Sequence, residues 1–160
     1  MSLRLIFATL AICSTAIFTG AMLTIGLSFG AYWKSLPPQD FLNWFSANSQ
    51  FIGRTIPIFI VPAATGLAVS VWLGWPIAPV RYLWLAASAS LAAVLIVTAA
   101  YHLPTNAAFE AQSIAPSQVA TTLNTWLWLH ALRIALGLSA AILSVAATLR
   151  YFSMTFSPPM

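Results

Sequence analysis

Two ionisable side chains in the last apolar segment have the spacing of a reactive pair. Trp126, His130, Arg133 and Gly137 follow one another at intervals of four, three and four residues, so a helix places them on one face. An imidazole can take up or deliver a proton near neutral pH, and a guanidinium can hold an enolate, phenolate or carboxylate. His130 and Arg133 are therefore the primary catalytic candidates. The structural alternative is a polar cap in which they only bond helix ends, loop carbonyls or acids.

Other polar side chains are expected at the same end of the molecule. His102 ends the third apolar segment, and a histidine at a helix C-terminus also suits the helix dipole. Two histidines on adjacent helices could ligate a haem or a transition metal, with Glu110 or Asp40 completing the set, although no compact metal motif is present. The residues predicted to gather there are His102, His130, Asn106, Glu110, Asn124, Arg54, Arg133, Asp40 and Asn43.

The composition requires that these groups be positioned by a membrane protein. Of 160 residues, 61% are apolar and only 5% are charged, whereas a soluble surface needs about a quarter of residues charged. Residues 1–160 are expected to form one transmembrane domain in contact with lipid. The six Lys and Arg residues are scattered singly, which excludes nucleic acid as a partner. Cys13 is the single cysteine, so no intramolecular disulfide can form.

Four apolar segments are long enough to cross a bilayer, at about 5–31, 55–75, 82–102 and 126–149. They predict an all-α, antiparallel four-helix bundle. Pro62 should kink the second helix, and Pro104 should end the third. Ser117 is a plausible N-cap for a fourth helix that projects beyond the bilayer.

The two connections of about twenty residues are expected to contain short interfacial helices that roof the bundle on the non-cytoplasmic side. The first has a prolyl start, and the second is capped by Thr105. Gly26 and Gly30 favour packing inside the bundle. The aromatic residues predicted to form an interfacial belt are Tyr32, Trp33, Trp72, Trp75, Tyr82, Trp84, Tyr151 and Phe152.

The positions of the Lys and Arg residues predict the orientation of the chain in the membrane. Arg4, Arg81 and Arg150 flank the side that carries both termini, and no acid accompanies them. The excess of cations on short cytoplasmic flanks therefore places both termini in the cytoplasm and the polar site toward the non-cytoplasmic side, with the bacterial inner membrane as the expected location.

The chain resembles the small four-helix membrane proteins of the anthrone oxygenase-like family, long catalogued as a domain of unknown function. The resemblance covers nearly the whole chain and rests on Phe18-Thr19-Gly20-Ala21, on His102-Leu-Pro-Thr-Asn106, and on Trp126 through His130-Ala-Leu-Arg133. Members tied to a reaction convert an anthrone to an anthraquinone with dioxygen and need no added cofactor. The resemblance implicates Asn106, Trp126 and Arg133, and at the position of His130 the family alternates between His and Asn.

These residues fit that chemistry. His130 could take a proton from an acidified methylene while Arg133 and Asn106 hold the oxyanion, and Trp126 could stack on the ring plane. Further substrate-binding candidates are His102, Arg54 and Asn43, and a hydrophobic substrate would come from the bilayer. Two alternatives stay open, a haem- or metal-binding redox protein that uses His102, His130 and Glu110, and a non-enzymatic membrane subunit or ligand-binding helper. The oligomeric state is not specified.

Overall fold

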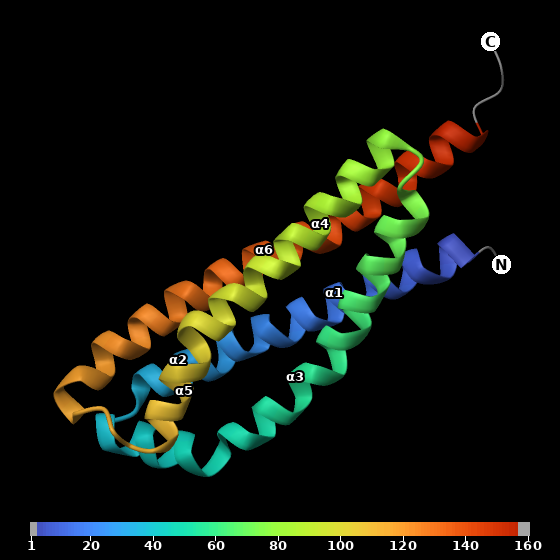
Figure 1. Cartoon of the computed structure of the whole chain (residues 1–160). Helices are drawn as coiled ribbons and strands as arrows, with labels where there is room; N and C mark the ends of the chain where they lie inside the picture. The colour runs from blue at the N-terminus through green and yellow to red at the C-terminus, as the bar shows by residue number, and fades with distance from the viewer. Residues whose placement is uncertain (1–2, 157–160) are drawn as a thin grey trace.

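The computed structural model describes residues 3–156, and within this range the chain forms four continuous helical rods joined by short turns. Successive rods run in opposite directions, so the two ends of the chain lie at the same end of the bundle (Figure 1). The predicted all-α, four-helix architecture is confirmed. The rods are α1 (Leu3–Thr24), η1 (Ile25–Phe29) and α2 (Gly30–Ser35); α3 (Pro38–Gly74); α4 (Ala78–Val97), η2 (Thr98–His102) and α5 (Leu103–Glu110); and α6 (Pro116–Phe156).

The helices are longer than predicted because they absorb the two long connections. Pro38 opens α3, as the prolyl start predicts, but the helix then continues unbroken through Pro57 and Pro62 to Gly74. The first predicted interfacial helix is thus the beginning of α3 and not a separate element. α3 bends along its length (Figure 1), as prolines inside a helix favour.

The third rod also passes the proline that was predicted to end it. A π-turn, in which the Leu103 N–H bonds to the Thr98 carbonyl, comes directly before Pro104. This wider turn relieves the crowding that a prolyl ring creates with the carbonyl four residues earlier. Thr105 therefore lies inside α5 and caps nothing, and the expected second interfacial helix is a continuation of the third rod. α6 begins at Pro116, so Ser117 lies in its first turn.

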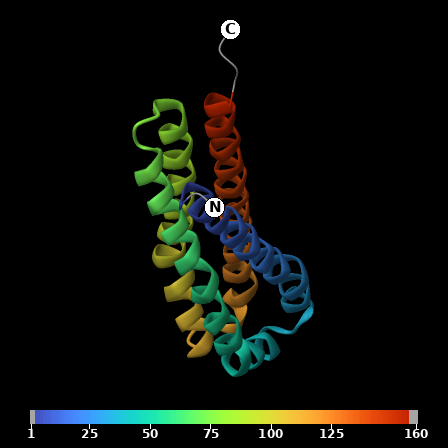
Figure 2. The same ribbon diagram turned by 90° about the vertical axis from the view of Figure 1, so that its right-hand side faces the viewer.

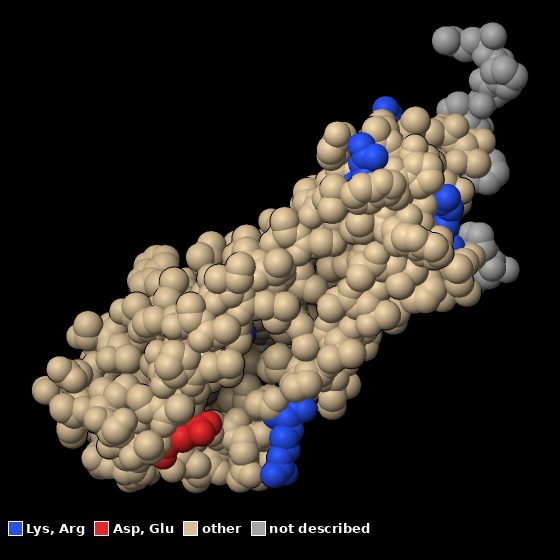
Figure 3. Space-filling model, viewed as in Figure 1, with Lys and Arg blue, Asp and Glu red and all other residues tan. Residues whose placement is uncertain are grey.

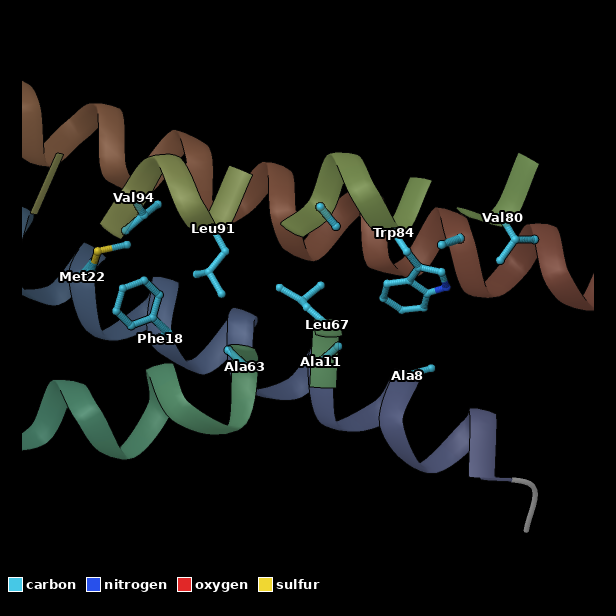
Figure 4. Packing of buried hydrophobic residues seen from close by; sticks show 12 residues of the cluster. Ala8, Ala11, Phe18, Met22, Ala63, Leu67, Val80, Trp84, Leu91 and Val94 are labelled. Carbon is cyan, nitrogen blue, oxygen red and sulfur yellow. The ribbon is translucent and has the colours of Figure 1, made fainter. Parts of the chain in front are cut away.

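α1 packs against both α3 and α6, while α4 packs mainly against α6. α1 crosses the bundle obliquely (Figure 2). A Cβ atom added to Gly66 of α3 would lie 2.5 Å from the Ala11 nitrogen of α1, so only glycine permits this approach. The core between the rods is apolar toward the termini, with Leu67, Trp84 and Leu91 at its centre (Figure 4).

Large apolar side chains cover the outside of the bundle, and several small polar residues lie inside it. Buried positions include Thr15, Ser70 and Ser144, whereas Leu27, Ile96 and Ile142 are about two-thirds exposed. This is the arrangement of helices that pack in lipid, where small residues allow close approach. Each of the four rods is long and apolar enough to cross a membrane.

Two members of the predicted aromatic belt are buried instead. Trp33 and Trp84 are 1% and 4% exposed, while Trp72, Trp75 and Tyr82 lie on the surface as expected. The belt assignment was wrong for the first two because flanking position does not determine which way a helical residue faces. Gly30 and Gly26 pack inside the bundle as predicted, since a Cβ on Gly30 would lie 2.7 Å from a methyl group of Leu127.

Candidate functional site

A cavity of about 360 Å³ lies in the half of the bundle away from the chain termini. Its volume falls in the range of small-molecule sites, about 300–1,000 Å³. The surface is hollowed there, with acidic and basic groups near the opening (Figure 3). The bordering residues are Ile25 and Trp33; Phe45, Ser49, Ile52, Gly53, Ile56 and Pro57 of α3; Thr98, His102, Leu103, Asn106, Ala107 and Glu110; and Trp126, His130 and Arg133 of α6.

His130 is held against the first rod. It is 1% exposed, and its Nε2 atom lies 2.8 Å from the Met22 carbonyl oxygen. Gly26 leaves the space for this approach, because a Cβ atom there would lie 3.1 Å from His130 Cδ2. The second ring nitrogen, Nδ1, is buried without a hydrogen-bond partner.

His102 lies close to His130, as expected for histidines on adjacent helices. It is also 1% exposed, its Nδ1 atom lies 3.4 Å from the Val97 carbonyl oxygen, and its Nε2 atom is buried without a partner. The two imidazole centroids are 6.0 Å apart. Trp126 contacts both, stacking on His130 at 4.8 Å and meeting His102 edge-on at 4.8 Å. The indole ring therefore fixes the separation of the two histidines.

The same indole orients Asn106. Trp126 Nε1 donates a hydrogen bond of 2.8 Å to Asn106 Oδ1, which joins α6 to α5. Since the indole N–H can only donate, this bond identifies the amide oxygen and leaves the amide NH₂ group of Asn106 available to a ligand.

Within residues 3–156, Arg133 is a buried cation without a counter-ion. It is 6% exposed, and its one hydrogen bond runs from Nη2 to the Met22 sulfur at 3.6 Å, while Nε has no partner. No carboxylate of residues 3–156 is paired with it: the Glu110 carboxylate instead accepts a 2.7 Å hydrogen bond from Ser49 Oγ, and Asp40 is exposed. In this part of the chain the acids do not close a polar cap, but the His130 contact with the Met22 carbonyl is of the kind that the structural alternative predicts.

Two predicted substrate-binding residues lie outside the cavity lining. Arg54 is exposed and donates to Gln50 Oε1 at 3.2 Å. Asn43 is exposed as well, and its Oδ1 accepts hydrogen bonds from Gln39 and Gln112 on the surface of the same end. The structure thus brings together His102, Asn106, Trp126, His130 and Arg133, and separates Arg54 and Asn43 from them.

An aromatic cluster packs at the cavity end of the bundle, and the two segments that were predicted to roof the bundle supply part of it. Trp33 is at its centre, 5.7 Å from Trp126 and 5.6 Å from Phe45, and Phe41 meets Phe109 edge-on at 4.9 Å. The sequence prediction missed Trp33 as a cavity residue. Its spacing from Gly26 and Gly30 was the available signal, because intervals of four and three place all three on the face that meets α6.

The residues around the cavity include three side chains of types that can ligate a metal. Both histidines and Glu110 border the cavity, but among residues 3–156 no three His, Cys, Asp or Glu side chains lie close enough together to hold a metal ion. The arrangement offers two imidazole nitrogens, one guanidinium, one amide and flat aromatic walls. It can accept a planar ligand that carries an oxygen anion.

Comparison with protein-family models, with curated proteins and with solved structures gives no significant match for this chain. The function is therefore argued from the geometry of the site and from the motifs of the sequence.

Proposed function

We propose that the chain is an integral membrane protein whose four rods cross a bacterial inner membrane with both termini in the cytoplasm. Support comes from the length and hydropathy of the rods and from the large apolar side chains that face outward. Arg4 stacks on Tyr151, and Arg81 on Trp75 and Tyr82, at the end that holds the termini. Cations with interfacial aromatics and no acid are typical of a cytoplasmic boundary.

We further propose that it is an oxygenase of the anthrone oxygenase-like type, which acts on a flat, apolar aromatic substrate. The observation that carries this proposal is Arg133, a buried guanidinium beside a cavity with no carboxylate partner among the described residues. Burying an unpaired charge destabilises the folded protein by several kcal/mol. A bound ligand that carries a negative charge would offset this destabilisation. His130 lies one turn away on the same helix. There it can act as the base that removes a proton from the ligand and so generates the ligand's negative charge.

The proposed reaction converts an anthrone and dioxygen into an anthraquinone and water. His130 removes one proton from the central methylene, and Arg133 with the Asn106 amide holds the resulting enolate oxygen. The enolate carbon gives electrons to dioxygen and forms a C–O bond, and the peroxide takes up a proton. Loss of the second methylene proton, with cleavage of the O–O bond, releases water and leaves the second carbonyl group. Dioxygen is the oxidant, and the proposal requires no cofactor.

A substrate from the bilayer would reach the cavity between α3 and α5. Gly53 and Pro57 border the cavity on one side and Leu103 and Ala107 on the other, and all four are exposed. The hollow that they flank is open to the surface (Figure 3). An apolar ligand would therefore need no passage through water.

The test is oxygen uptake and quinone formation by the purified protein in detergent with a panel of anthrones. His130→Ala and Arg133→Gln should each lower turnover by about 10²-fold or more, since each removes a group that acts only in the transition state. Arg54→Gln, an exposed arginine outside the cavity, is the matched control and should keep full turnover. Unchanged turnover in either cavity variant would overturn the mechanism.

The second candidate is a haem- or metal-binding redox protein. Each histidine has one ring nitrogen near a backbone carbonyl and the other unpartnered, which is the usual environment of metal-ligating histidines. An absorption spectrum with elemental analysis distinguishes the candidates. A Soret band or stoichiometric metal that disappears in His102→Ala or His130→Ala would favour this one, whereas ligand binding without turnover or chromophore would favour a non-enzymatic helper.

A further inference from the structure

The first rod and α6 approach each other closely at two levels. A Cβ atom added to Gly26 of the first rod would lie 3.1 Å from His130 Cδ2, and one added to Gly137 of α6 would lie 2.5 Å from Thr19 Oγ1. Met22 lies between these two contacts on the same face of the first rod, three residues after Thr19 and four before Gly26. It is 0% exposed, so its side chain is enclosed where the two helices meet.

Met22 contacts both of the proposed catalytic side chains. Its backbone carbonyl oxygen lies 2.8 Å from His130 Nε2, and its sulfur accepts a 3.6 Å hydrogen bond from Arg133 Nη2. His130 and Arg133 border the cavity, whereas Met22 is not among the residues that line it. The imidazole and the guanidinium are thus both held by one residue of another helix.

We propose that Met22 is a positioning residue whose thioether orients the Arg133 guanidinium and leaves its positive charge available to a ligand anion. A thioether sulfur is a weak, uncharged hydrogen-bond acceptor, so it directs an N–H group without neutralising the cation. A carboxylate at the same place would form an ion pair with the guanidinium and compete with the ligand. This inference rests on the proposed role of Arg133 as the group that holds the anion, but it does not require that the ligand be oxidised.

Met22→Leu removes the sulfur and keeps the backbone carbonyl group. Leucine and methionine have similar volumes, and exchanges of this kind in a packed core are well tolerated. We therefore expect the fold and the His130 contact to persist while the guanidinium loses its acceptor. Met154→Leu, at a position 48% exposed near the C-terminal end of α6, is the matched control.

The direct test is NMR of the detergent-solubilised protein with ¹⁵N-labelled arginine and histidine, in which Arg133→Gln identifies the Arg133 signals by their absence. Rotation about the Nε–Cζ bond should be slower in Arg133 than in the exposed Arg150, and Met22→Leu should accelerate it. The His130 signals should stay as in the wild type, and Met154→Leu should change neither residue. Fast rotation of Arg133 in the wild-type protein, or rotation that Met22→Leu leaves unchanged, would overturn the inference. An equal disturbance of the His130 signals would overturn it as well, because the effect would then be one of general packing.

The consequence for a ligand is tested with 2-naphthoate and 2-naphthamide, which share a ring system and differ in charge. In titration calorimetry the wild-type protein should bind 2-naphthoate more tightly, and Met22→Leu should reduce this preference by about threefold or more, with little change in the affinity for 2-naphthamide. Equal affinities in the wild-type protein would overturn the anion-holding role of Arg133 and this inference with it. A preference that Met22→Leu leaves unchanged would overturn the role of Met22 alone. Failure of anthrone turnover, with the expected naphthoate results, would instead overturn only the oxygenase proposal.

Discussion

The indole N–H of Trp126 donates a 2.8 Å hydrogen bond to Asn106 Oδ1, twenty residues earlier in the chain. The bond joins α6 to α5, and the same indole stacks on His130 and contacts His102. One side chain thereby positions an amide and two imidazoles around the cavity. Asn106 and Trp126, which the resemblance described above implicates, are the two partners in this contact.

Trp126→Phe keeps an aromatic ring for the histidines but removes the donor to Asn106. We expect the free energy of unfolding to fall by more than about 1 kcal/mol, the net value of one hydrogen bond, because the smaller phenyl ring also leaves part of the buried indole volume empty. Turnover should fall as well, because the Asn106 amide becomes free to rotate. Thermal unfolding in detergent measures the first effect and oxygen uptake the second. Trp128→Phe, at a position 79% exposed, is the control and should change neither quantity.

Arg133→Met should make the protein more stable and inactive. The substitution replaces an unpaired buried cation by an apolar side chain of similar length, a change we expect to raise the free energy of unfolding by about 1–4 kcal/mol. Ligand binding should be lost in the same variant. Arg54→Met removes an exposed cation and should leave stability nearly unchanged. A destabilised Arg133→Met protein would show that the guanidinium has a structural partner and not a ligand.

Ser49→Ala should open the mouth of the cavity. The Ser49–Glu110 hydrogen bond of 2.7 Å connects α3 to α5 beside the proposed access route. Its loss should lower the free energy of unfolding by about 1 kcal/mol and raise the association rate of 2-naphthol, measured by stopped-flow fluorescence. Ser46→Ala, an exposed serine three residues earlier, should alter neither. A slower association rate in Ser49→Ala would contradict the assignment of this contact to the mouth.

Gly66→Ala should be the most destabilising of these changes. The new Cβ atom would lie 2.5 Å from the Ala11 nitrogen and 2.8 Å from its Cα atom, so α1 and α3 would have to separate. Gly53→Ala in the same helix, where a Cβ atom meets nothing within 4 Å, should instead stabilise by about 0.5–1 kcal/mol through helix propensity. Thermal unfolding of the two variants in parallel is the measurement.

The face of α6 could be predicted because periodicity determines it. Trp126, His130, Arg133 and Gly137 are all buried, as intervals of four and three residues require. The lengths of the rods could not, because Pro38 and Pro104 indicate a boundary but do not show whether the helix starts, continues or stops there. Pro104 is accommodated by a π-turn, which has no clear sequence signature.

The hydrogen-bond partners of the site residues could not be predicted from the sequence either. The histidines contact the backbone carbonyl groups of Met22 and Val97. Every residue has such a carbonyl group, so the residue types do not indicate which ones the histidines contact. The burial of Trp33 depends on how α1 and α2 rotate against α6. The cavity depends on the divergence of α3 from its neighbours, which no single segment specifies.

The bundle is closely packed toward its termini and hollow at the opposite end. Leu67, Trp84 and Leu91 belong to the first region, and the cavity residues belong to the second. None of these three core residues lines the cavity. Substitutions around the cavity should therefore alter its shape and polarity while the core around Leu67, Trp84 and Leu91 stays packed.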